Sequence, residues 1–312
     1  MAAAKTQEMG NSAAEALSKW KSTGRILPQR GITMKKIMIC VAPVSGADAV
    51  INPRIIAEDV KRCYELGACM VHLHVRDLNG HLTPDLTLLE KTVACIRKQC
   101  DIVVEISTGG VSDLSIAQRI QPVYAPWAEC VSLNVGSVNL GDAVYQNPIA
   151  DVKTCVQEIV RQHKVPETEL FEVGMAKTLR DLADAYSIPK PLLVALVFGH
   201  AGEMPATRAG LRHLVMALYD NFDPEEVIWG YTQAGRRDWE MVRYALSCGA
   251  GTLRLGFEDS DCLDPGVPTD ANADLIARAA GIVRSMGMEP MTTAECRDLL
   301  HLPAVSGGVL HG

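Results

Sequence analysis

The segment MVHLHVRD, residues 70–77, has the pattern of a buried β-strand that carries two histidines two positions apart. Side chains at positions i and i+2 of a strand point to the same face, so the imidazoles of His72 and His74 are expected to enter one interior space together. Two neutral imidazoles are a common part of a zinc site, which needs a third protein ligand and keeps one position open when it is catalytic. The alternative is a pair of hydrogen-bonded core histidines.

Similar apolar runs recur from Ile37 onward and alternate with stretches of helical periodicity. We predict eight strands, at residues 37–42, 69–75, 102–107, 130–134, 169–173, 192–198, 227–231 and 252–256. Helix-start and turn signals lie between them, at Asn52-Pro53, Thr83-Pro84, Asn147-Pro148 and Asp223-Pro224. Near-continuous apolar strands are typical of a parallel sheet buried on both faces. The pattern therefore predicts an α/β fold, a (β/α)₈ TIM barrel, and no G-x-G-x-x-G motif follows the first strand to favour a dinucleotide-binding sheet.

The composition favours a small-molecule partner. The chain has 312 residues, 48% of them hydrophobic, and a net charge of -7 with scattered Lys and Arg, so no attraction to nucleic acid or acidic membranes is expected. No apolar stretch approaches the roughly 18 residues of a membrane span. The ten cysteines contain no C-x-x-C pair, and we expect free thiols in a reducing, cytoplasmic location rather than a disulfide framework.

The first 33 residues differ from the rest of the chain. Residues 1–33 are Ala-rich and show no strand pattern, so we expect an N-terminal extension, either disordered or produced by a start assigned upstream of Met34. Residues 34–49 resemble a short signal peptide, but the barrel repeat needs a first strand there. We therefore predict a single catalytic domain over residues 34–312.

Polar residues gather where the predicted strands end, and this is the end of a TIM barrel at which active sites lie. Because the eighth strand closes beside the first and the second is one step further, Glu258 or Asp259 can supply a third metal ligand to the histidines. Zn²⁺ is the default ion, although the same ligands also suit Fe²⁺, Mn²⁺ or Co²⁺. The alternative role of the two carboxylates is to cap a helix N-terminus.

Two further strand ends carry candidate binding groups. Arg254 lies on an apolar strand, and a guanidinium inside a barrel needs an anion, either Asp259 or a substrate carboxylate. A structural ion pair explains Arg254 equally well. The loop at residues 107–110, with sequence STGG, offers hydroxyl and backbone N–H groups to a carboxylate or phosphate, and its alternative is a simple tight turn.

Five motifs, in order, resemble those of the β-keto acid cleavage enzyme family. They are HLHVR at 72–76, ISTGG at 106–110, LNVGSVN at 133–139, FEVGM at 171–175 and RLGFED at 254–259. The likeness extends from about Lys36 to Leu302. Each motif stands at a predicted strand end, so together they are far more specific than any one of them.

The resemblance implies a zinc-dependent TIM barrel, usually a homo-oligomer and in this family a tetramer. Its implied reaction converts a β-keto acid and acetyl-CoA into acetoacetate and a new acyl-CoA. The implied site residues are the zinc ligands His72, His74 and Glu258, the catalytic residues Asp259, Arg254 and Glu172, and the substrate-binding residues Asp48, Ser107, Gly109, Gly110 and Ser137.

Several positions depart from the family pattern. Ser137 replaces a threonine, and Asp48 replaces a glutamate that pairs with a substrate amino group, although an Asx turn would also explain Asp48. His200 and Glu203 stand where smaller or neutral residues are expected. We therefore expect an acyl specificity unlike that of the family's first characterised member.

Two alternatives remain open at this stage. A zinc hydrolase of the amidohydrolase type also combines an H-x-H pair with a carboxylate at the eighth strand, but there the pair sits on the first strand with further histidines. A non-catalytic protein that binds a metal or an acyl-CoA is the second alternative. The apparently complete set of ligands and base argues against it.

Overall fold

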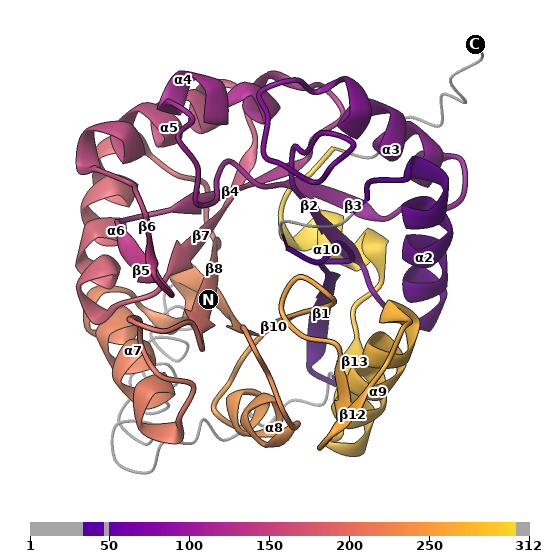
Figure 1. Ribbon diagram of the computed structural model, residues 1–312. Coiled ribbons are helices and arrows are strands. Elements are labelled where there is room, and N and C mark those ends of the chain that lie inside the picture. Colours follow the sequence, from indigo (N-terminus) through magenta and orange to yellow (C-terminus); the bar gives the residue numbers. More distant parts are fainter. Residues whose placement is uncertain (1–33, 47–49, 304–312) are drawn as a thin grey trace, which may run out of the picture.

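Eight parallel strands form a closed barrel in the computed structural model, which describes residues 34–46 and 50–303 (Figure 1). In order around the barrel they are β1 (Lys36–Val41), β2 (Met70–Leu73), β3 (Val103–Ile106), β4 (Cys130–Asn134), β7 (Val165–Leu170), β8 (Leu192–Phe198), β9 (Val227–Gln233) and β10 (Thr252–Leu255). Parallel pairing of β10 with β1 closes the ring, with Met38 in register with Thr252. The predicted TIM barrel is confirmed.

Helices form the outer ring around these strands (Figure 1). They are α2 (Pro53–Leu66), α3 (Thr87–Arg97), α4 (Ile116–Arg119), α5 (Ile149–Arg161), α6 (Val173–Tyr186), α7 (Arg208–Asn221), α8 (Glu240–Ser247) and α9 (Asn272–Ser285). Their apolar faces cover the barrel, as Ala57 and Val60 of α2 illustrate. The helix start predicted at Asn52 is confirmed, because its side-chain oxygen accepts hydrogen bonds from the N–H groups of Arg54 and Ile55.

The fifth barrel strand does not lie at its predicted position, residues 169–173. Strand β7 begins at Val165 and ends at Leu170, and α6 begins at Val173. The prediction overlaps β7 at residues 169 and 170 but missed residues 165–168, where Pro166 and Glu167, followed by Glu169, make the segment look polar and solvent-exposed. Both glutamates are in fact buried. The other seven predicted strands overlap the observed ones.

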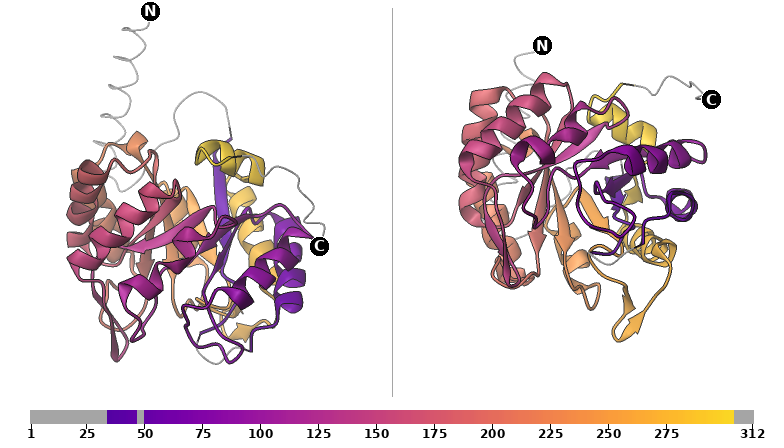
Figure 2. Two further views of the ribbon diagram at one scale, coloured as in Figure 1. Left: turned by 90° about the horizontal axis from the view of Figure 1, so that it is seen from above. Right: turned by 45° about the horizontal axis from the view of Figure 1, so that its top comes forward.

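Helix α10 (Thr293–Leu299) closes the end of the barrel where the strands begin, and it lies at one end of the molecule in the left view of Figure 2. Its Cys296 packs against Met38 inside the barrel, with 3.4 Å between the two sulfur atoms. Arg297 fixes the helix by donating a hydrogen bond to Glu129, at 2.8 Å. The opposite end, where the strands terminate, is the end at which TIM barrels carry their active sites.

Two small hairpins and three short segments complete the described structure. The hairpins pair β5 (Val138–Leu140) with β6 (Ala143–Tyr145) and β11 (Cys262–Asp264) with β12 (Val267–Pro268). The other segments are β13 (Glu289–Pro290), η1 (Gln121–Tyr124) and η2 (Pro224–Glu226). Because the hairpins follow β4 and β10, they stand at the end of the barrel where the strands terminate.

The cysteines agree with the sequence prediction. All ten lie in the described part of the chain, eight are buried, and no disulfide joins any of them. None of the described helices has the length and apolar character to span a bilayer. The extension predicted for residues 1–33 lies outside the described residues.

Candidate active site

His72 and His74 lie together at the end of β2, as their spacing predicts. Their Nε2 atoms are 3.3 Å apart. His72 is buried and in register with Glu105 of the neighbouring strand β3. Nδ1 of His72 lies 2.5 Å from Oε1 of Glu105. When Nδ1 donates its proton to this carboxyl group, Nε2 keeps its lone pair for a metal ion.

Glu258 approaches the histidines from the loop after β10. Its Oε1 lies 3.2 Å from Nε2 of His74 and 3.7 Å from Nε2 of His72. Gly256 allows this approach, because it has a φ of 144° and a Cβ there would lie 2.2 Å from the carbonyl oxygen of Ala42. The N–H of Glu258 donates a 3.2 Å hydrogen bond to the same oxygen, which fixes the loop beside β1.

The three donor atoms have the spacing that a zinc ion requires. Tetrahedral coordination with bonds of about 2.0–2.2 Å places neighbouring donors about 3.3–3.6 Å apart. The observed separations are 3.2, 3.3 and 3.7 Å. Burial alone would raise the pKa of Glu258, but the charges of His74, Arg254 and His72 hold it well below its usual range, so the carboxylate is ionised. These residues therefore fit a zinc ion.

A second group of possible ligands, His72, Glu105 and Glu167, lies deeper in the barrel. Burial raises the pKa of Glu105 to about 8 and raises the pKa of Glu167 well above its ordinary value. The raised pKa favours the protonated form of Glu167, whose carboxyl group lies within 4.8 Å of that of Glu105. A protonated carboxyl group is a poor metal ligand. We therefore interpret Glu105 and Glu167 as residues that orient His72 through its Nδ1 atom rather than as a second metal site.

Arg254 and Asp259 form a buried pair beside the histidines. Nη2 of Arg254 donates to Oδ1 of Asp259 at 2.8 Å, and Nε donates to Oδ2 at 3.2 Å. Nη1 of the same guanidinium lies 3.5 Å from Glu169. Burial raises the pKa of Asp259, even though the charge of Arg254 opposes the shift. Because Asp259 is paired with Arg254, Glu258 is the carboxylate that faces the histidines.

The comparisons with known proteins agree with this geometry. A family model described as beta-keto acid cleavage enzyme matches residues 47–302. The chain belongs to this family. It is thus an enzyme, and the resemblance seen in its motifs is confirmed.

Two curated relatives illustrate the breadth of the β-keto acid cleavage enzyme family. The 3-keto-5-aminohexanoate cleavage enzyme of Fusobacterium nucleatum is 29% identical over 283 residues, which cover 86% of this chain and 99% of that protein. The 3-oxoadipate:acetyl-CoA acetyltransferase of Cupriavidus necator is 30% identical over 249 residues, which cover 80% of this chain and 86% of that protein.

A solved structure shares the fold. The apo structure of ObcA superposes with a TM-score of 0.68 at 19% identity, and the match covers 82% of this chain and 66% of ObcA. The present chain thus spans slightly less than two thirds of ObcA. At this level of identity the likeness supports the barrel alone.

In this family member, the loops expected to bind substrate lie at the same end of the barrel as the histidines. Ser107 directly follows β3, and its hydroxyl oxygen lies 3.2 Å from both the backbone nitrogen and the carbonyl oxygen of Gly109. A Cβ at Gly109 would overlap the hydroxyl of Tyr145 on β6, so this loop and the β5–β6 hairpin fit closely together. Gly110 follows in the same loop, and Ser137 is exposed at the base of the hairpin.

Glu172 lies at the cap position of α6 and not on a strand, which corrects the sequence prediction. It is half-buried, and burial together with the charge of Glu203 raises its pKa. Oε1 of Glu203 accepts a hydrogen bond from the N–H of His200 at 2.8 Å and lies 2.9 Å from Nδ1 of the same residue. Asp48 lies outside the described residues.

The sequence reasoning missed three buried carboxyl groups, those of Glu105, Glu167 and Glu169. A usable signal existed for Glu105, since it interrupts the apolar strand β3 two positions after Val103. The pair on β7 has the two-residue spacing of a single strand face, like the histidines of β2. Their detection required the correct position of β7.

We expect the substitution Glu105→Gln to weaken zinc binding by roughly 10- to 100-fold, as changes behind a metal-bound histidine commonly do. The amide keeps the volume of the carboxyl group but cannot form the carboxylate that accepts the proton of Nδ1 of His72. Zinc affinity is measured by competition with a chromophoric chelator. The matched control is Glu129→Gln, which alters a carboxylate at the other end of the barrel. Equal zinc affinity in both variants would exclude the supporting role of Glu105.

Proposed function

We propose that this enzyme transfers the acyl group of a β-keto acid to CoA, with acetyl-CoA as co-substrate and acetoacetate as the second product. One observation carries the proposal: the buried Arg254–Asp259 pair lies directly beside the zinc-compatible group of His72, His74 and Glu258. Family membership and relatives named as acetyl-CoA-dependent transferases support this reaction.

We propose that His72, His74 and Glu258 hold Zn²⁺. When bound, the ion supplies Lewis acidity toward the 3-keto oxygen and so lowers the cost of removing a proton from C2. His72 and His74 contribute neutral nitrogen donors, and Glu258 contributes the negative charge. Glu105 keeps His72 in one orientation through the hydrogen bond at Nδ1.

Asp259 is the proposed general base. Its carboxylate removes the C2 proton, and the two hydrogen bonds from Arg254 fix its direction. The enolate carbon then attacks the carbonyl carbon of acetyl-CoA, and the CoA thiolate leaves. That thiolate attacks C3 of the condensed acid, the C2–C3 bond breaks, and the proton on Asp259 returns to C2 to give acetoacetate and the new acyl-CoA.

We assign the remaining binding roles to the loops around the mouth of the barrel. We propose that Ser107, Gly109 and Gly110 contact the substrate carboxylate and that Ser137 offers a hydroxyl. Because the N–H of Gly109 donates to the hydroxyl of Ser107 in the structure, a bound carboxylate would have to replace that hydrogen bond. We also propose that Glu172, whose pKa is raised by burial and by the charge of Glu203, is a further active-site carboxylate.

The reaction is tested with a panel of cationic, neutral and anionic β-keto acids, each assayed with and without acetyl-CoA. We expect at least one acid to be consumed only when acetyl-CoA is present, with acetoacetate and an acyl-CoA formed in equal amounts. Both products are quantified by mass spectrometry. Consumption that is independent of CoA would indicate a zinc hydrolase, and no consumption of any acid would contradict the proposed reaction.

A further inference from the structure

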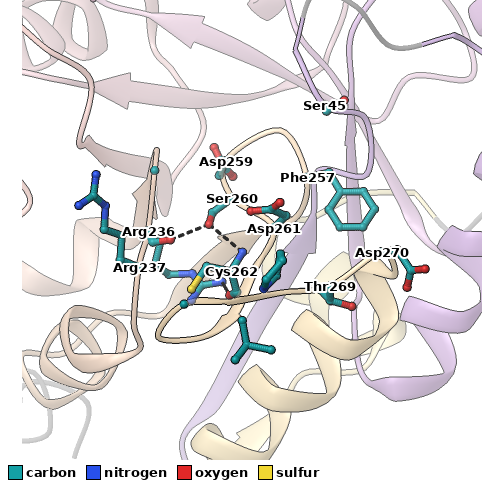
Figure 3. Close-up of a pocket in the computed structure, with 14 residues that line it drawn as sticks. Ser45, Arg236, Arg237, Phe257, Asp259, Ser260, Asp261, Cys262, Thr269 and Asp270 are labelled. Atoms are coloured by element: carbon teal, nitrogen blue, oxygen red, sulfur yellow. Dashed lines mark hydrogen bonds between the residues drawn. The ribbon is translucent and has the colours of Figure 1, made fainter.

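A pocket of about 890 Å³ is lined in part by Asp259 (Figure 3). The loop after β9 forms one wall, and the segment after β10, with the β11–β12 hairpin, forms another. Small-molecule sites commonly enclose about 300–1,000 Å³, so the volume suits a sizeable ligand. Because Asp259 lines it, the pocket leads directly to the proposed base.

Arg236 belongs to the wall of this pocket. It is only 3% exposed, and its guanidinium stacks on the ring of Trp239 at 3.8 Å. It donates hydrogen bonds to the carbonyl oxygens of Asp238 and Cys262, and its own carbonyl oxygen accepts a 2.7 Å hydrogen bond from Ser260. These contacts tie the β11–β12 hairpin to the loop after β9, so the guanidinium of Arg236 is already held in place by protein groups.

Arg237 differs from Arg236 in both its exposure and its contacts. It is exposed at the same pocket, and no side chain or carbonyl group of the described residues pairs with its guanidinium. An unpaired guanidinium presents a planar set of donors that matches the oxygens of a phosphate. Arg237 is therefore the arginine of this pocket that can bind a phosphate group.

The remaining lining is mixed. Phe257 and Val267 supply apolar surface, Thr269 supplies a polar group, and Asp261 and Asp270 are acidic. Acidic walls repel a nucleotide with several phosphates, whereas a neutral chain with amide groups suits them. A ligand with a neutral arm inside the pocket and its phosphates near Arg237 would match this distribution of charge.

We propose that this pocket binds the pantetheine arm of acetyl-CoA, with the thioester end beside Asp259 and the phosphates of the nucleotide at Arg237. This assignment rests on the proposed function. The C2 carbon deprotonated by Asp259 has to come within about 3–3.5 Å of the acetyl carbonyl carbon, so the arm has to enter through space that adjoins Asp259. The described pocket provides that space.

The first test measures the binding of desulfo-CoA, which lacks the reactive thiol, by isothermal titration calorimetry. We expect Arg237→Ala to weaken binding by roughly tenfold, since one charge-assisted contact is lost. The control Arg212→Ala removes an equal charge from α7, away from the pocket, and should leave the affinity unchanged. Pantetheine, which has no nucleotide phosphates, should bind the wild type and Arg237→Ala equally well.

The second test uses the unmodified protein. Cys262 lines the pocket, and Cys95 on α3 does not; both are half-buried, whereas the other eight cysteines are buried. Saturating desulfo-CoA should slow the alkylation of Cys262 by iodoacetamide at least threefold and leave the rate at Cys95 unchanged. Peptide mass spectrometry follows both sites in one sample.

The outcomes separate this assignment from the reaction itself. If desulfo-CoA binds but neither protects Cys262 nor depends on Arg237, the pocket is not the CoA site and the proposed reaction still stands. Binding that depends on Arg237 without protection of Cys262 would also overturn the pocket assignment. If neither desulfo-CoA binding nor turnover with acetyl-CoA is detected, the proposed function fails and the assignment fails with it.

Discussion

Replacing His72 with alanine is expected to remove both the bound zinc and the catalytic activity. His72 supplies one of three donor atoms, and it links the metal site to Glu105 behind it. With only His74 and Glu258 left, the zinc content should fall from about one ion per chain to a small fraction of that value. The loss of Lewis acidity is worth several kcal/mol, which corresponds to a decrease in kcat/KM on the order of 10³ or more.

Zinc content is measured by plasma mass spectrometry, and activity by acyl-CoA formation. His213→Ala is the matched control, because His213 is exposed on α7 outside the barrel. Thermal unfolding of each variant shows whether the fold is retained. A folded His72→Ala protein that still holds one zinc ion would remove His72 from the ligand set.

The substitution Asp259→Asn is expected to leave zinc bound and to lower kcat by about 10²–10⁴, the usual contribution of a general base. An amide has nearly the size of the carboxyl group, but it cannot take up the C2 proton. Its oxygen still accepts a hydrogen bond from Arg254, so the local packing should change little. The proposed zinc ligands His72, His74 and Glu258 are unchanged in this variant.

This prediction is checked by measuring kcat and zinc content on the same preparation. Asp298→Asn on α10 is the control, since it removes an exposed carboxylate at the closed end of the barrel. Activity equal to that of the wild type in Asp259→Asn would contradict its role as the base. A loss of zinc in this variant would instead place Asp259 among the ligands.

Most of the barrel strands could be predicted from the sequence, because each strand of a parallel barrel has a simple local pattern. Strands buried on both faces are nearly continuous apolar runs, as in β8, and short polar segments mark where each run ends. The fifth strand broke this pattern, because Glu167 and Glu169 enter the barrel interior. From sequence alone, a charged residue is interpreted as a surface residue unless its buried partner is known.

The partner of Glu169 is Arg254, which lies on another strand and 85 positions later (254 − 169). No local periodicity connects two residues that are so far apart. For the same reason, the sequence did not predict that Glu105 and Glu167 lie next to His72, since the three residues are on different strands. Buried charge can be located only when the closure of the barrel is known.

For this protein, the sequence alone determined the barrel, the paired histidines and the set of polar strand ends that belong to one family. Spacing along a single strand is enough to place His72 and His74 on one face. The tertiary structure alone decided that Glu258 faces His74 across 184 positions of sequence, while Asp259 pairs with Arg254. It also separated the buried Arg236 from the exposed Arg237. The physical reason is that ligand sets and ion pairs depend on distances of about 3 Å, which arise only when β10 closes against β1.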